Sequence, residues 1–197
     1  MTTALTGMLV GLSIIVAIGA QNAHVLRQGL LRSHVGTVVA ICLASDVILI
    51  TAGVTGLAAL VQEHPVAVQV LRWGGAAYLA GYGLLSLWQA RRPRTLDAGA
   101  GARQSRRGVA MSTLALTYLN PHLYIDILML GSIANQYGPD RWWFLAGTLT
   151  ASALWFIGLG YGAKAASQVL ARPTTWRVID LVIGLLMLAL AVRLATG

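Results

Sequence analysis

Two aspartates stand out in the sequence because they lie inside long apolar stretches. Asp46 lies nine residues after Thr37, where its apolar stretch begins. At 1.5 Å of rise per residue this is roughly 13–14 Å along a helix, near the middle of a bilayer core about 30 Å thick. Asp126 lies inside another apolar stretch, about one and a half helical turns beyond Asn120. Both carboxyl groups are therefore predicted to lie within a membrane.

A carboxylate in hydrocarbon is costly, on the order of 3 kcal/mol at the centre of a helix on insertion scales. Such a group can release its proton when a cation joins it and take the proton back when the cation leaves. Asp46 and Asp126 are thus candidates to bind the ammonium or guanidinium of a substrate and to couple to protons. The structural alternative is that each aspartate hydrogen-bonds a neighbouring helix, for instance through Ser45 or Tyr118.

Two places in the chain predict a break in a helix. Pro121 lacks a backbone N–H and clashes with the preceding turn, so a kink is expected over residues 117–120. Residues 19–22 form a flexible, amide-rich segment at the corresponding place in the first apolar stretch. Backbone groups freed at such breaks bind charged parts of substrates in transporters, whereas the alternative is an ordinary proline kink. The candidate substrate-binding residues are Gln21, Asn22, Asp46, Asn120, Pro121 and Asp126.

Other polar residues within or near the apolar stretches are open to simpler interpretations. His24 and His122 are candidate proton relays, although a histidine near a helix end more often anchors by hydrogen bonds. Asp180 follows Arg177 by three residues, so a local ion pair at a helix N-terminus is expected. The glycine pairs at 7 and 11 and at 158 and 162 are expected to allow close packing of helices.

The composition indicates which elements must hold these residues. Of the 197 residues, 57% are hydrophobic and only 10% are charged, and the mean hydropathy is +0.71. A soluble domain carries charge on about a quarter of its residues, so an all-α polytopic membrane protein is predicted. Six transmembrane helices are expected, at residues 4–26, 37–61, 66–88, 109–133, 142–163 and 176–194. The first is expected to be retained rather than removed as a signal peptide.

The same composition argues against several classes of function. Cys42 is the single cysteine, which excludes a disulfide framework and CxxC metal motifs, so neither a metal site nor a cofactor is expected. The formal net charge is +8, but the basic residues lie between apolar runs, where membrane lipids rather than nucleic acid are the expected partner. The sequence contains no GxSxG, HExxH or paired CxxC motif, so an enzyme is not expected.

The distribution of basic residues predicts how the chain is oriented. With the N-terminus outside, the inner loops hold 11 of the 14 lysines and arginines and the outer side holds 3. Basic loops remain in the cytoplasm, so both termini are predicted to lie outside.

The long basic loop at 91–108 separates a first three-span repeat, 1–90, from a second, 109–197. Two repeats of three spans enter the membrane from opposite sides and must be inverted, a plan common among secondary transporters. The recurrence of Asn22-Ala23-His24 as Asn120-Pro121-His122 supports this prediction.

Taken in order along the chain, these motifs resemble those of the lysine exporter family, and in particular its lysine/arginine exporter branch. The first stretch is similar at Gly19-Ala20-Gln21-Asn22-Ala23-His24-Val25-Leu26-Arg27-Gln28-Gly29, and the fourth at Leu119-Asn120-Pro121-His122-Leu123-Tyr124-Ile125-Asp126. Further similarity lies at 42–56, 72–83, 155–163 and 176–180, so the resemblance covers nearly the whole chain. Two residues depart from the family pattern: His24 stands where an apolar or aromatic residue is usual, and Ile127 where a threonine is common.

The resemblance implies a multi-pass exporter of L-lysine and L-arginine in a bacterial inner membrane, driven by the proton gradient or membrane potential. It also implies homo-oligomerisation. Asp46, Asn120, Pro121 and Asp126, together with Gln21 and Asn22, match the family's characteristic positions. Three alternatives stay open from the sequence: export of neutral amino acids, export of metal ions, and a membrane scaffold that transports nothing.

Overall fold

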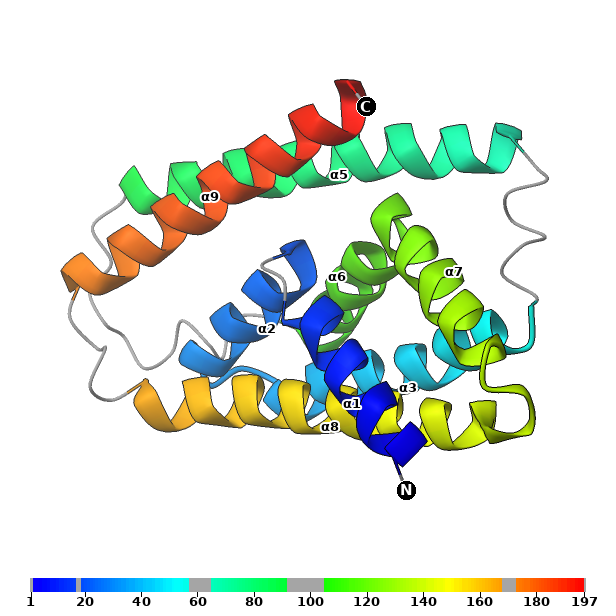
Figure 1. Cartoon of the computed structure of the whole chain (residues 1–197). Coiled ribbons are helices and arrows are strands. Elements are labelled where there is room, and N and C mark those ends of the chain that lie inside the picture. Colours follow the sequence, from blue (N-terminus) through cyan, green and yellow to red (C-terminus); the bar gives the residue numbers. More distant parts are fainter. Residues whose placement is uncertain (1, 17–18, 57–64, 92–104, 168–172, 197) are drawn as a thin grey trace.

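Figure 1 shows the computed structural model of the chain, which describes residues 2–16, 19–56, 65–91, 105–167 and 173–196. Every regular element within these ranges is a helix, as the composition predicted. The α-helices are α1 (Thr2–Ile15), α2 (Ala20–Leu30), α3 (Val35–Val54), α5 (Pro65–Arg91), α6 (Arg106–Tyr118), α7 (Pro121–Asn135), α8 (Arg141–Ala166) and α9 (Pro173–Thr196), with a 3₁₀ helix η1 at Gly138–Asp140. Most of the predicted basic loop, 92–104, lies outside the described residues.

Among the described helices, three are long and apolar enough to cross a membrane by themselves: Val35–Val54, Gly138–Ala166 and Arg177–Thr196. A fourth crossing is possible if α1 and α2, which meet at 83°, act as one bent span. In α7 the apolar part, Leu123–Asn135, is shorter than a full span. The structure is therefore that of an all-helical membrane protein, and the number of six spans stays a prediction.

The second predicted break lies where it was expected, between α6 and α7, whereas the first lies before the expected residues 19–22, because α2 already begins at Ala20. The two breaks are built alike. The α1 helix ends at Ile15, and the side-chain amide of Asn22 in α2 donates to the Ile15 carbonyl at 2.8 Å. The α6 helix ends at Tyr118, and the Tyr124 hydroxyl in α7 donates to the Tyr118 carbonyl at 2.9 Å. A helix end leaves carbonyls without a partner in the helix. In each break the following helix supplies a side chain that satisfies one of them.

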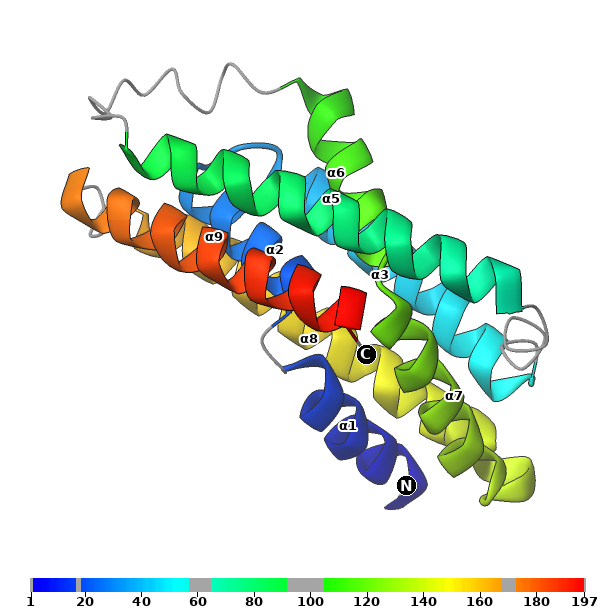
Figure 2. The ribbon, with the colours of Figure 1, turned by 90° about the horizontal axis from the view of Figure 1, so that it is seen from above.

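The helices form two layers. The first layer is the pair α5 and α9, which run side by side (Figures 1 and 2). In the second layer α8 packs against α1, α2 and α3, and α3 also packs against α6 and α7. Glycines bring these backbones together: a Cβ on Gly7 would collide with the backbone of Phe144 in α8, and one on Gly53 with Ile127 in α7. Small residues allow such close contact between membrane helices.

Of the two glycine pairs predicted to allow close helix packing, only the first does so. Gly7 and Gly11 contact α8, as expected. The expectation was wrong for Gly158 and Gly162, because a Cβ at either position would meet open space. Gly160, which lies between them, is the residue that contacts Val39 of α3. The face of α8 that packs is therefore shifted by two residues from the face that the motif suggested.

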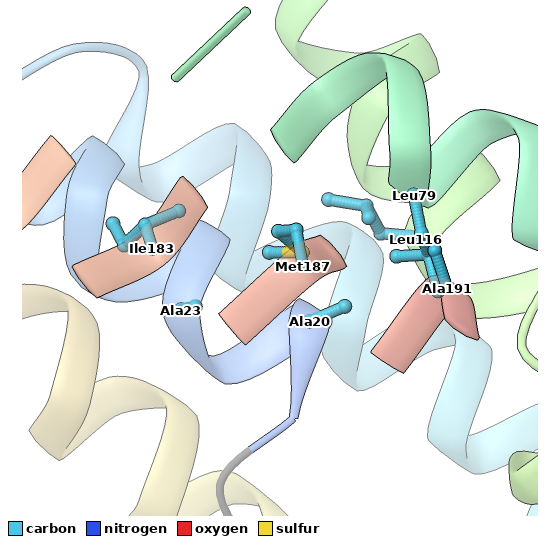
Figure 3. Packing of buried hydrophobic residues seen from close by; sticks show 7 residues of the cluster. All are labelled: Ala20, Ala23, Leu79, Leu116, Ile183, Met187 and Ala191. Carbon is cyan, nitrogen blue, oxygen red and sulfur yellow. The ribbon is translucent and has the colours of Figure 1, made fainter. Parts of the chain in front are cut away.

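A hydrophobic cluster joins the two layers (Figure 3). Its buried members are Ala20 and Ala23 of α2, Leu79 of α5, Leu116 of α6, and Ile183, Met187 and Ala191 of α9. The two alanines lie on the part of α2 that follows the first break, so their small size lets α9 come close to that helix. The cluster thus connects α2, in the second layer, with α5 and α9 in the first.

Candidate functional site

Asp46 is held by a hydrogen bond between helices. It lies on α3 with 7% of its surface exposed, and it accepts a hydrogen bond from the hydroxyl of Ser152 on α8. Ser152 is itself buried. The carboxyl group therefore points into the helical layer, as the functional interpretation required. The structural alternative was right that a neighbouring helix supplies a hydrogen bond, but the donor is Ser152 and neither Ser45 nor Tyr118.

The polar residues at the first break lie next to Asp46. The Trp155 indole on α8 donates to the Asn22 side-chain oxygen at 3.2 Å. Because Trp155 follows Ser152 by three residues, both lie on the same face of α8. Gln21 lies near the side chain of Cys42, one helical turn before Asp46 on α3. The structure thus gathers Gln21, Asn22 and Asp46 where α2, α3 and α8 meet.

The residues of the second break lie on α7 and on the turn before it. Asp126 is half-buried on α7, and the next residue, Ile127, contacts Gly53 of α3. Gly53 follows Asp46 by seven residues, so this contact lies about 10 Å along α3 from Asp46. Asn120 precedes α7, and its carbonyl accepts from the Leu123 backbone N–H at 3.1 Å.

The two aspartates are therefore on helices that pack against each other, α3 and α7. That they share one polar chamber stays a prediction. The side chains of Pro121 and His122 lie outside the described ones, so the substrate-binding and proton-relay roles predicted for them stay predictions.

A second polar cluster joins the two layers, and the sequence did not predict it. Arg27 of α2 forms an ion pair with Asp180 of α9 at 3.3 Å, and the two side chains are 4% and 1% exposed. The expected local pair of Asp180 with Arg177 is wrong, since Arg177 is exposed at the start of the helix while Asp180 points inward. An ion pair buried this deeply holds together the elements that carry it, because removing one partner leaves a buried charge.

Tyr82 and His24 extend this ion pair into a chain of hydrogen bonds. The Arg27 guanidinium donates to the Tyr82 hydroxyl at 3.1 Å, and that hydroxyl lies 3.1 Å from Nδ1 of His24. On the other side of the ring, Nε2 lies 3.2 Å from the hydroxyl of Thr113, which itself donates to the Val109 carbonyl. The Thr113 oxygen must therefore accept from Nε2–H, and Nδ1 accepts from Tyr82.

This assignment makes His24 a neutral imidazole that connects α5 with α6. His24 is only 2% exposed. The geometry agrees with the hydrogen-bonding anchor that the sequence offered as the alternative to a proton relay. The signal that could have revealed the cluster was present in the sequence, because a buried acid in one apolar run and an arginine at the end of another each need a partner.

A pocket of about 500 Å³ lies beside this chain of hydrogen bonds. The residues that line it are His24, Arg27 and Gln28 of α2, Ala77, Tyr78, Gly81, Tyr82 and Leu85 of α5, and Ser105, Gly108, Val109 and Ser112 at the start of α6. Neither Asp46 nor Asp126 is among them. In the part of the chain that the structure describes, no group of three or more His, Cys, Asp or Glu residues could hold a metal ion.

The architecture is that of a helical membrane protein with broken helices and polar groups buried at the breaks, a combination found in transporters. The chain belongs to the LysE type translocator family, whose model matches residues 12–197.

Proteins named as transporters are similar to this chain over nearly their whole length. The lysine exporter LysE of Corynebacterium diphtheriae is 41% identical, covering 98% of this chain and 99% of its own. The arginine exporter ArgO of Yersinia enterocolitica is 39% identical, covering 97% of this chain and 95% of its own. A putative amino-acid transporter of Mycobacterium bovis is 43% identical, covering 90% of this chain and 89% of its own. No solved structure matches the chain.

Proposed function

We propose that this protein exports the basic amino acids L-lysine and L-arginine and catalyses no chemical reaction on them. The similar proteins are named as exporters of these two amino acids over almost the full chain. The observation that carries the proposal is Asp46, a buried acid in the middle of α3 whose hydrogen bond to Ser152 turns it away from lipid. A carboxylate in such surroundings favours a cationic group beside it.

The proposed mechanism assigns a role to each polar group near the breaks. Asp46 binds the side-chain cation of the substrate, and Asp126 shares that charge or carries the exchanged proton. Gln21, Asn22 and Asn120, with the backbone at Pro121, orient the amino-acid head group. Ser152 fixes the rotamer of Asp46, so the acid is positioned before the substrate arrives. His122 remains a candidate for proton coupling, whereas His24 is assigned the anchoring role that its hydrogen bonds favour.

We further propose six spans in two inverted repeats, 1–90 and 109–197, that rock against each other to give alternating access. The helix contacts support this relation. Each half contains one broken helix, and α2 after the first break packs on α8 while α7 after the second break packs on α3. If α8 and α3 are counterparts, these two contacts are equivalent. The third helices of the two repeats, α5 and α9, are then also counterparts, and they pack against each other.

The location follows from the charge distribution and from the family. We propose a bacterial inner membrane, both termini outside, coupling to the proton gradient or the membrane potential, and assembly into a homo-oligomer. The inner side then carries 11 of the 14 basic residues, as the cytoplasmic side of membrane proteins does.

Counterflow in proteoliposomes tests the proposed function. Vesicles loaded with unlabelled arginine should accumulate labelled arginine and lysine, and an imposed pH gradient should change the rate if protons are coupled. Labelled threonine and leucine serve as controls for neutral substrates. Accumulation of the neutral pair in place of the basic pair would overturn the substrate class, and no accumulation of any of them would favour a protein without transport activity.

A further inference from the structure

The pocket beside Arg27 lies where the two helical layers meet. Its walls come from α2, from the middle of α5 and from the first turns of α6. Its volume of about 500 Å³ falls within the range of small-molecule sites, roughly 300–1,000 Å³. Such sites combine apolar walls with a few polar groups that fix the orientation of the ligand. Here Tyr78, Gln28 and Ser112 supply neutral polar groups.

The charge of the pocket selects the kind of ligand. Among the described residues that line it, Arg27 carries the only formal charge, and its partner Asp180 stands behind it outside the lining. Asp180 and the Tyr82 hydroxyl hold the guanidinium in one position. A guanidinium presents its N–H donors in a planar fork with more than one edge, so it can serve Asp180 and a second anion together. Charge-assisted hydrogen bonds of this kind are among the stronger ones in proteins.

The start of α6 adds to the same preference. Ser105 caps this helix by accepting from the Gly108 N–H, and both residues line the pocket. The N-terminus of a helix carries a partial positive charge. A negative group in the pocket would therefore face Arg27 on one wall and the positive end of α6 on another.

We propose that this pocket is an entry site that binds the α-carboxylate of the exported amino acid, with Arg27 as the carboxylate-binding group. The proposal rests on the proposed function and on the predicted orientation, which puts Arg27 and the start of α6 on the cytoplasmic side. The substrate meets this site before it reaches Asp46. Asp46 alone would accept any organic cation, so a site that requires a carboxylate lets the exporter retain amines such as agmatine and cadaverine in the cell.

Filling the pocket tests the site without touching the ion pair. Gly81 lines the pocket, and a Cβ there would meet open space, so Gly81→Leu should fold and occupy the cavity. Gly74 lies two turns earlier on α5, also faces open space and does not line the pocket, which makes Gly74→Leu the matched control. We expect Gly81→Leu to raise KM for arginine about tenfold or more, equivalent to about 1.4 kcal/mol of binding, while Gly74→Leu transports normally. An unchanged KM in Gly81→Leu, or an equal loss in both variants, overturns the proposal.

Removing both charges tests the role of Arg27. The double variant Arg27→Gln/Asp180→Asn leaves no unpaired buried charge. The wild type should prefer arginine over agmatine, which is arginine without its carboxylate, and the double variant should lose that preference. Retention of the preference overturns the role of Arg27. If the double variant elutes as an aggregate, the Gly81→Leu result decides alone.

The lipid composition of the vesicles and the wild-type protein provide two controls. The alternative ligand is the anionic headgroup of a lipid. In that case the Gly81→Leu effect would appear in vesicles that contain phosphatidylglycerol and vanish in vesicles of phosphatidylcholine alone. That result would overturn the proposal. Wild-type protein that moves no basic amino acid contradicts the proposed function. Wild-type transport with an unaffected Gly81→Leu variant contradicts only the entry site.

Discussion

The carboxyl group of Asp46 on α3 accepts a hydrogen bond from the hydroxyl of Ser152 on α8, 106 residues away in the chain. Both side chains are buried where these helices meet the start of α2. If the two halves of the protein are inverted repeats, α3 and α8 are equivalent helices. The bond then joins the two repeats at the proposed substrate-binding acid, so a movement that separates α3 from α8 would break it.

Replacing the acid tests whether Asp46 binds the substrate. Asp46→Asn keeps the size of the side chain and can still accept from Ser152, but it cannot carry a negative charge. We expect export of lysine and arginine to fall to background, because the substrate cation loses its partner, while the protein remains monodisperse in detergent. Full transport by the variant would remove Asp46 from the mechanism.

Removing the Ser152 hydroxyl tests whether the hydrogen bond positions Asp46. A hydrogen bond to a charged group contributes about 1.5–3 kcal/mol, so Ser152→Ala should weaken arginine binding by roughly one order of magnitude. Thr150→Ala on the same helix is the control, because that exposed hydroxyl bonds only to its own helix at Ala146. The measurement is KM in proteoliposomes, and equal values for the two variants would show that the bond does not matter.

The buried ion pair should show strong coupling in unfolding experiments. Arg27→Gln or Asp180→Asn alone leaves one buried charge and should cost about 3–5 kcal/mol of stability. The double variant should cost less than the sum of the two single changes, because no uncompensated charge remains. Thermal unfolding in detergent measures all three. Additive losses would mean that the two side chains do not interact.

Close packing between α3 and α7 makes Gly53 sensitive to any side chain. A Cβ at this position would collide with the backbone of Ile127, whereas one at Gly158 would meet open space. Overpacking costs typically about 1–3 kcal/mol, so Gly53→Leu should lower the unfolding temperature clearly and Gly158→Leu should leave it nearly unchanged. Equal stability of the two variants would contradict the α3–α7 contact.

The sequence by itself determined the class of the protein. Its low charge and long apolar runs required helices that bury in lipid, and Pro121 and Gly19 marked where two of them break. These properties follow from local chemistry, because hydropathy acts on each stretch separately and a proline disrupts the helix in which it lies. The unusual acid at Asp46 could be recognised for the same reason.

Only the tertiary structure decided which polar groups meet. Asp180 has Arg177 three residues away in sequence, yet it pairs with Arg27 on a distant helix. The glycines that pack on α8 are likewise chosen by the neighbouring helix and not by their spacing. A polar side chain in an apolar helix must find a partner, but its identity depends on the rotation and crossing of helices, which the pattern of one stretch does not contain.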